Sequence, residues 1–150
     1  WKVVEGEFGH LLGSRDEFFG NGGEYNKQGK YYLTTLEGSA DAKRGSDSQR
    51  GIVVSPIFIP ERGEMTFRVG GGNGEGTYVA LCAADGKEIK YARGVNNQAM
   101  QKAKWDLSLY AGRKMFIKIV DQSTSGWGHI TADNFEFDAE VLEEYPKISQ

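Results

Sequence analysis

The stretch Glu-Met-Thr-Phe-Arg-Val, residues 64–69, alternates polar and apolar side chains with a period of two. Residues two apart in a β-strand share one face, so the pattern predicts a half-buried strand with Met65, Phe67 and Val69 inside and Arg68 on the wet side. A glycine-rich loop, residues 70–76, follows directly. A short strand that ends in such a loop is typical of an all-β domain with many turns.

Further strands are predicted on both sides of this one, because short aromatic, β-branched or apolar runs alternate with turn residues along the chain. Pro56 cannot donate to a β-ladder and should interrupt its strand. The dipeptide Asp85-Gly86 predicts a hairpin turn, a parity change near Asp133-Asn134 predicts a β-bulge, and residues 97–102 resemble a helical turn. The other predicted strands are Tyr31–Leu36, Gly51–Ile59, Thr77–Ala83, Lys87–Ala92, Arg113–Val120 and His129–Phe137.

About eight or nine antiparallel strands pack most simply as two sheets, so we expect a jelly-roll β-sandwich, with an eight-stranded barrel as the alternative. The predicted sandwich covers residues 1–140. Residues 141–150 are predicted to form a polar, acidic C-terminal tail or linker. No second domain and no internal repeat is expected.

Composition excludes several classes of function. The chain has 150 residues and a net charge of -3 with both signs interspersed, which argues against binding to nucleic acid. No apolar run approaches the roughly 18 residues that a membrane span needs. The single cysteine, Cys82, allows neither an internal disulfide nor a multi-cysteine metal site, and it should be a small core residue. Because the chain begins at Trp1, we expect it to be a piece of a larger protein.

The most unusual segment joins Asp121 to His129 through a small-residue turn that contains Trp127. Carboxylates accept hydrogen bonds from sugar hydroxyls, and aromatic rings pack on the apolar faces of sugar rings. The structural alternative is that Trp127 plugs the end of the sandwich while Asp121 ties down its own turn. Residues 37–50 form a second candidate, a long polar loop that either binds hydroxyls or is simply solvated.

The glycine loop at residues 70–76 resembles a phosphate-binding loop only superficially, because a strand rather than a helix follows it. Its glycines are expected to let another group approach the backbone closely. We expect the loops to converge at one end of the sandwich, where Arg68 can fork onto two hydroxyls. The predicted ligand-binding residues are Glu37, Asp47, Arg50, Arg68, Gly71, Gly72, Asp121, Trp127 and His129.

Several motifs occur in an order that resembles the galactose-binding-like β-sandwich attached to bacterial levanases, and most closely carbohydrate-binding module family 66. The resemblance spans roughly residues 4–138. Its most specific part is Gly-Trp-Gly-His-Ile at residues 126–130. The other motifs are residues 26–37, 51–58, 67–72 and 105–112, together with Ile119-Val120-Asp121 and Asp133-Asn134-Phe135.

The resemblance implies a non-catalytic module that binds the terminal sugar of a polysaccharide, most plausibly a fructan such as levan or inulin. It also implies a covalently linked glycoside hydrolase and a secreted or cell-surface location in bacteria. Such sandwiches often hold a structural Ca²⁺ between the first and last strands, for which the oxygen donors would be Glu5, Glu7, Asp133, Asn134 and Asp138. The alternatives are a structural or adhesion sandwich of a surface protein, and a small jelly-roll enzyme.

Overall fold

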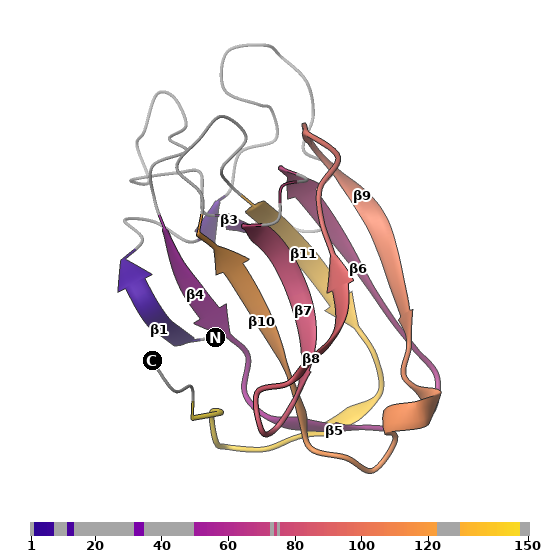
Figure 1. Ribbon diagram of the computed structural model, residues 1–150. Helices are drawn as coiled ribbons and strands as arrows, with labels where there is room; N and C mark the ends of the chain where they lie inside the picture. Colours follow the sequence, from indigo (N-terminus) through magenta and orange to yellow (C-terminus); the bar gives the residue numbers. More distant parts are fainter. Residues whose placement is uncertain are drawn as a thin grey trace.

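Strands make up most of the chain that the computed structural model describes, which is residues 2–7, 12–13, 32–34, 50–72, 74, 76–122 and 130–147. They form two sheets that face each other (Figure 1). One short 3-10 helix, η1, spans Ser108–Tyr110. The strands are β1 (Lys2–Glu7), β2 (Leu12–Gly13), β3 (Tyr32–Thr34), β4 (Arg50–Val54), β5 (Phe58–Pro60), β6 (Glu64–Gly71), β7 (Thr77–Ala83), β8 (Glu88–Ala92), β9 (Asn97–Asp106), β10 (Met115–Asp121), β11 (Ile130–Glu136) and β12 (Ala139–Val141).

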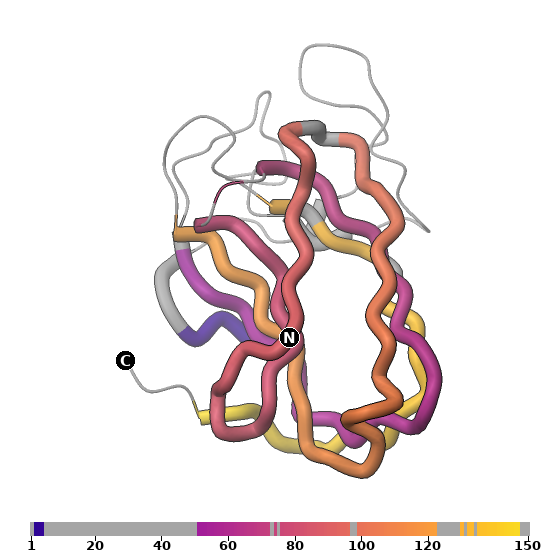
Figure 2. Tube along the Cα trace, turned by 45° about the vertical axis from the view of Figure 1, so that its right-hand side comes forward, coloured from indigo at the N-terminus to yellow at the C-terminus, as the bar shows by residue number. Residues whose placement is uncertain are grey.

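The order of the strands is that of a jelly roll. Sheet A contains β1-β4-β10-β7-β8, with β5 and β12 added where β10 begins, and sheet B has the order β2-β3-β11-β6-β9. From β3 to β11 the chain crosses between the sheets at nearly every step, so β4-β10-β7-β8 faces β3-β11-β6-β9. The turned view in Figure 2 shows the two layers apart. The predicted two-sheet antiparallel sandwich is therefore confirmed.

The core lies between the sheets and is rich in aromatic and branched side chains. The alternation predicted for β6 is confirmed, because Met65, Phe67 and Val69 are all buried. The ring of Phe67 lies between two others, with its centroid 4.6 Å from that of Trp105 and 5.0 Å from that of Phe135. Such tilted and stacked pairs stabilise a core beyond the area they bury.

The predicted break at Pro56 separates β4 from β5, and Ser55 replaces the missing ladder contacts. The Ser55 amide donates to the Ile117 carbonyl at 2.9 Å. The Ser55 hydroxyl accepts from the Ile117 amide and donates to the Pro56 carbonyl, each at 2.9 Å. A buried serine thus satisfies backbone groups that the proline leaves without a strand partner.

Two further expectations about turns and bulges are confirmed. The Asp85 carboxylate accepts from the Lys87 amide at 2.9 Å, and the Ala83 amide donates to the Lys87 carbonyl, which closes the β7–β8 hairpin. In β11 the register against β6 shifts between Asp133 and Glu136. The shift marks the predicted bulge, which turns Phe135 towards the core beside Phe67.

The helical turn expected at residues 97–102 is wrong, because these residues open the ten-residue strand β9. The segment is rich in residues that favour helices, but β9 pairs with β6 from Glu64–Asp106 to Gly71–Asn97. Met100 and Trp105 are buried along the strand. Pairing with β6 and burial of these side chains therefore outweigh the local helix preference.

The fold also continues past residue 140, where the tail was expected to begin. Val141 ends β12, which pairs with β5. The Leu142 amide donates to the Ile57 carbonyl at 2.8 Å, and the Ile57 amide donates to the Glu144 carbonyl at 2.9 Å. Pro146 is buried. Residues 142–147 are therefore part of the packed sandwich.

Sheet A buries part of its outer face as well. Val54, Ala80, Cys82 and Phe116 form a second cluster there, and each is 0% exposed. The expectation that Cys82 is a core residue is thereby confirmed. In the described part of the chain, no helix has the length and apolar character of a membrane span.

Candidate functional site

The strand ends that were expected to carry the site do meet at one end of the sandwich. Asp121, the last residue of β10, lies opposite Gly51 at the start of β4 and opposite Thr77 at the start of β7. In the other sheet, Gly71 at the end of β6 lies opposite Ile130 at the start of β11. We call this the loop end of the sandwich, and it is the upper end in Figure 1.

Asp121 itself is fully buried. It has the same phase along β10 as Ile117 and Ile119, which belong to the core, so its side chain points between the sheets. Its neighbour across the ladder, Thr77, is 1% exposed. The closed-off carboxylate agrees with the structural alternative for Asp121. Its predicted contact with a ligand stays a prediction.

The start of the glycine loop packs against the segment that joins β8 to β9. Gly71 has a φ of 100° and Gly72 is buried. Gly94 lies directly against the backbone of Gly71, where the chain crosses from β8 to β9 at the top of Figure 2. The close backbone approach that the glycines were expected to permit is therefore made by Gly94. This contact leaves no room for a sugar ring between the Gly71 and Gly94 backbones.

Three hydrogen bonds fix Gly74 and Gly76, the described residues between Gly72 and Thr77. The Thr77 amide donates to the Gly74 carbonyl at 3.3 Å. The Gln122 amide donates to the Gly76 carbonyl at 2.7 Å, which ties the end of β10 to the start of β7. The Nε of Arg93 donates to the Gly74 carbonyl at 3.2 Å. Gly74 is exposed, so this residue, which we call the rim of the loop end, is both fixed by hydrogen bonds and accessible.

Arg68 does not join Asp121. The expectation that Arg68 is on the wet face of β6 is confirmed, since it is half-buried between two buried neighbours. It lies opposite Asp133 on one side and Lys102 on the other, on the outer face of sheet B. Asp121 points inward from sheet A into the core, so the two side chains do not share a surface.

The remaining predicted ligand residues lie at the boundary of the described part of the chain or outside it. Arg50 opens β4 opposite Glu7. Four others lie outside the described residues: Glu37, Asp47, Trp127 and His129. Their roles stay predictions.

The expected calcium ligands lie on separate sheets. Glu5 and Glu7 are in β1 and pair with β4, whereas Asp133 and Asn134 are in β11 of sheet B. Asp138 follows β11, and its carbonyl accepts from the Glu61 amide at 2.9 Å. Among the side chains that the structure describes, no group of three or more possible metal-binding residues comes together. A shared Ca²⁺ would have to bridge the two sheets.

A group that the sequence reading missed lies on the outer face of sheet A, next to the loop end. The guanidinium of Arg93 lies 5.2 Å from the ring centroid of Tyr78 and 5.6 Å from that of Tyr91. The two rings meet edge to face, with centroids 5.5 Å apart. Tyr91 is 48% exposed. We call these three residues the tyrosine–arginine cluster, and cation–π contacts of this kind hold a guanidinium in one orientation.

A partly buried ion pair adjoins the cluster on the same face. The Nζ of Lys118 is 3.0 Å from a carboxylate oxygen of Glu88, with side chains 14% and 22% exposed. Burial, followed by the effect of the nearby Glu88 carboxylate, raises the pKa of Tyr78 far above its usual value. Tyr78 is therefore a neutral hydroxyl beside the ion pair.

The apolar composition of β7 explains why the sequence did not reveal the tyrosine–arginine cluster. The strand Thr77–Ala83 is almost entirely apolar, so its period does not reveal which residues face outward. The register of the strands identifies the outward-facing residues, because Ala80 lies opposite Lys118 on one side and Tyr91 on the other.

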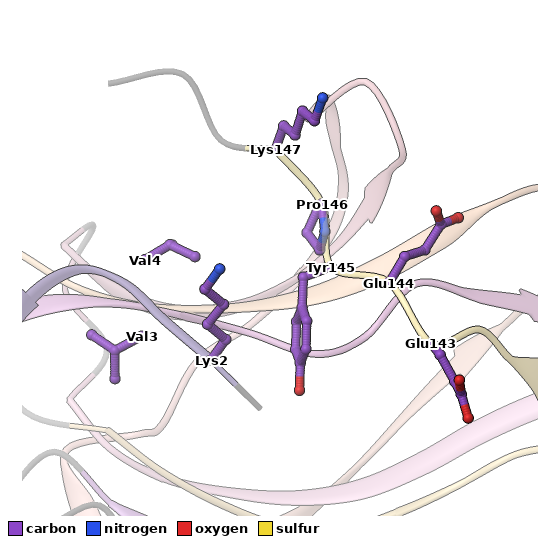
Figure 3. A pocket seen from close by; sticks show the side chains of 8 residues that line it. All are labelled: Lys2, Val3, Val4, Glu143, Glu144, Tyr145, Pro146 and Lys147. Carbon is purple, nitrogen blue, oxygen red and sulfur yellow. The ribbon is translucent and has the colours of Figure 1, made fainter.

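A separate pocket of about 630 Å³ lies between β1 and residues 143–147 (Figure 3). Lys2 and Tyr145 face each other in it, and the Nζ of Lys2 is 5.8 Å from the ring centroid. The Nζ of Lys114 pairs with a carboxylate oxygen of Glu144 at 3.4 Å and holds the tail nearby. No predicted ligand residue within the described part of the chain lines this pocket.

Comparison with known proteins relates part of the chain to a carbohydrate-active protein. The chain is 31% identical over 91 residues to "Putative glycosyl hydrolase ecdE" of Aspergillus rugulosus. The match covers 61% of this chain but 13% of that much longer protein. No protein-family profile matches the chain.

Two solved structures align with this chain. The K1 cleaved adhesin domain of Lys-gingipain from Porphyromonas gingivalis W83 aligns with a TM-score of 0.50 and 18% identity, over 95% of this chain and 90% of that one. A cyclase from Fischerella sp. TAU aligns with a TM-score of 0.48 and 13% identity, over 89% and 74% of the two chains. The adhesin domain confirms the fold, an all-β sandwich. The chain is thus a β-sandwich, part of which is related to a segment of a glycosyl hydrolase.

Proposed function

We propose that this chain is a non-catalytic carbohydrate-binding module that holds the terminal sugar of a polysaccharide at the loop end of its sandwich. In this proposal it directs a linked glycoside hydrolase to its substrate, in a secreted or cell-surface protein. Fructans such as levan and inulin are the first ligands to test, because the sequence resembles levanase-associated modules.

The observation that carries the proposal is the fixed, accessible rim beside the tyrosine–arginine cluster. Arg93 joins the two, because its Nε donates to Gly74 of the rim while its guanidinium stacks on two tyrosine rings. Aromatic faces next to oriented donors match the apolar and hydroxylated faces of a sugar ring. The related segment in a glycosyl hydrolase supports a carbohydrate context.

The binding experiment uses a glycan array that includes levan and inulin, followed by calorimetry on the sugars that bind. We expect dissociation constants of roughly 10 µM to 1 mM, since each protein–sugar hydrogen bond replaces one to water. Binding to no glycan would contradict the proposal. A reducing-end assay tests the non-catalytic part, and release of sugar from levan by the isolated chain would overturn it.

A second candidate is an adhesion domain that binds a protein surface. It is favoured by the likeness of the fold to the gingipain adhesin domain. This candidate predicts that no glycan binds, whereas the chain attaches to protein-coated surfaces. The same array therefore separates the two functions.

A further inference from the structure

We infer that the tyrosine–arginine cluster is a second sugar subsite, which receives the ring next to the one held at the loop end, from a neutral polysaccharide. The inference rests on the proposed function and adds to it a place for the next ring. It gives Tyr91 and Arg93 a binding role and predicts a dependence of affinity on chain length that a single pocket lacks.

The position of the cluster supports this role. Arg93 follows β8 directly and contacts the glycine loop, and Tyr91 is two residues earlier on the same edge strand. Residues two apart in a strand are about 7 Å apart on one face. A chain that leaves the loop end along β8 therefore passes Arg93 and then the exposed ring of Tyr91.

The chemistry of the cluster fits a hydroxylated ligand better than an apolar one. Among the described residues, the guanidinium of Arg93 contacts one carbonyl and two aromatic rings. Its terminal amino groups donate to no carboxylate of the described part of the chain. Covering these donors with an apolar surface would leave them buried without acceptors. Sugar hydroxyls supply acceptors, and the ring of Tyr91 supplies the apolar contact.

The local charge favours a neutral chain. Lys118 and Glu88 neutralise each other, which leaves Arg93 as the one net charge of the cluster and its adjoining ion pair. One guanidinium is no basic stripe of the kind that binds a polyanion. Its contacts with Gly74, Tyr78 and Tyr91 also fix its orientation before a ligand arrives, which lowers the entropy lost on binding.

The test measures binding of fructose and of levan-type oligosaccharides with two to five rings to four proteins by calorimetry. These are the parent chain, Tyr91→Ala, Tyr91→Phe and Tyr145→Ala. Tyr145 is the matched control, because it is 40% exposed and also lies near a cation, but in the pocket beside β1. Melting temperatures show that each variant is folded.

The parent chain should bind two or three rings about five- to tenfold more tightly than fructose, with little further gain for longer chains. Tyr91→Ala should abolish that gain while fructose still binds, and Tyr91→Phe and Tyr145→Ala should preserve it. Affinity should change little between 50 and 500 mM salt, a range over which the Debye length shortens about threefold.

The outcomes separate the two claims. If the parent chain binds none of these sugars, both the proposed function and this subsite are wrong for fructans. If it binds them but Tyr91→Ala matches it at every length, the subsite alone is wrong. An affinity that falls steeply with salt overturns the choice of a neutral chain.

Discussion

Gly94 lies so close to Gly71 that a Cβ atom at Gly94 would overlap the carbonyl oxygen, the carbonyl carbon and the amide nitrogen of Gly71. The contact joins the β8–β9 crossing to the end of β6, and Arg93 is the residue directly before it. The rim of the loop end and the tyrosine–arginine cluster are therefore held together by a glycine that admits no side chain.

Gly94→Ala should destabilise the fold by about 2–3 kcal/mol, because the obstructing atoms are backbone and a packed interior yields little. Gly74→Ala is the matched control, since nothing lies within 4 Å of a Cβ built there. Its effect should stay within about 0.5 kcal/mol. Urea unfolding measures both, and equal stabilities would show that the Gly71 backbone moves aside easily.

The ion pair between Lys118 and Glu88 should be worth more than an exposed pair. Lys118→Met leaves a mostly buried carboxylate without its partner, which should cost about 1–3 kcal/mol. Lys104→Met breaks the pair with Glu64, whose side chains are 63% and 54% exposed, and should cost less than about 1 kcal/mol. Thermal unfolding of the two variants would contradict this ranking if their losses were the same.

Ser55→Ala should destabilise the fold by about 1–3 kcal/mol, because the buried Ile117 amide loses its acceptor. Ser108→Ala, at an exposed position in η1, serves as the comparison and should lie within about 0.5 kcal/mol of the parent. Denaturant titration gives both values. If Ser55→Ala is neutral, the break at Pro56 does not depend on this hydroxyl.

Stability should fall in alkaline solution. Burial raises the pKa of Cys82 to about 12, and burial also raises the pKa of Tyr78. Folding favours the neutral form of each group, so their stabilisation is complete below the ordinary pKa values and is lost as pH rises from about 9. Urea unfolding between pH 7 and pH 11 measures the loss, and Cys82→Ala should reduce its slope. A stability that stays constant over this range would contradict the burial of both groups.

The same burial predicts that Cys82 does not react with a thiol reagent at pH 8 until the chain unfolds. Labelling of the native protein as fast as that of the urea-unfolded protein would show that the thiol is accessible.

The calcium site implied by the family resemblance stays a prediction. An ion that binds only the folded chain stabilises it, so a chelator should lower the melting temperature and added Ca²⁺ should restore it. Elemental analysis supplies the independent readout. A melting temperature that the chelator leaves unchanged, in a protein that contains no calcium, removes the site.

Sequence alone was enough to predict the two-sheet sandwich, because strand period, proline and turn residues are local properties. It placed β6 and β7, the interruption at Pro56, the Asp85-Gly86 hairpin and the bulge in β11. Each of these follows from side-chain alternation, from a missing amide donor or from turn chemistry within a few residues.

Tertiary packing determines which polar groups lie together. It made residues 97–102 a strand by pairing them with β6, and it buried Asp121 by giving it the inward phase of β10. It also brought Arg93 against Tyr78 and Tyr91 and set Gly94 against Gly71. These relationships depend on register between strands distant in sequence, and the free energy of burying side chains across two sheets outweighs the local preferences that a single sequence reveals.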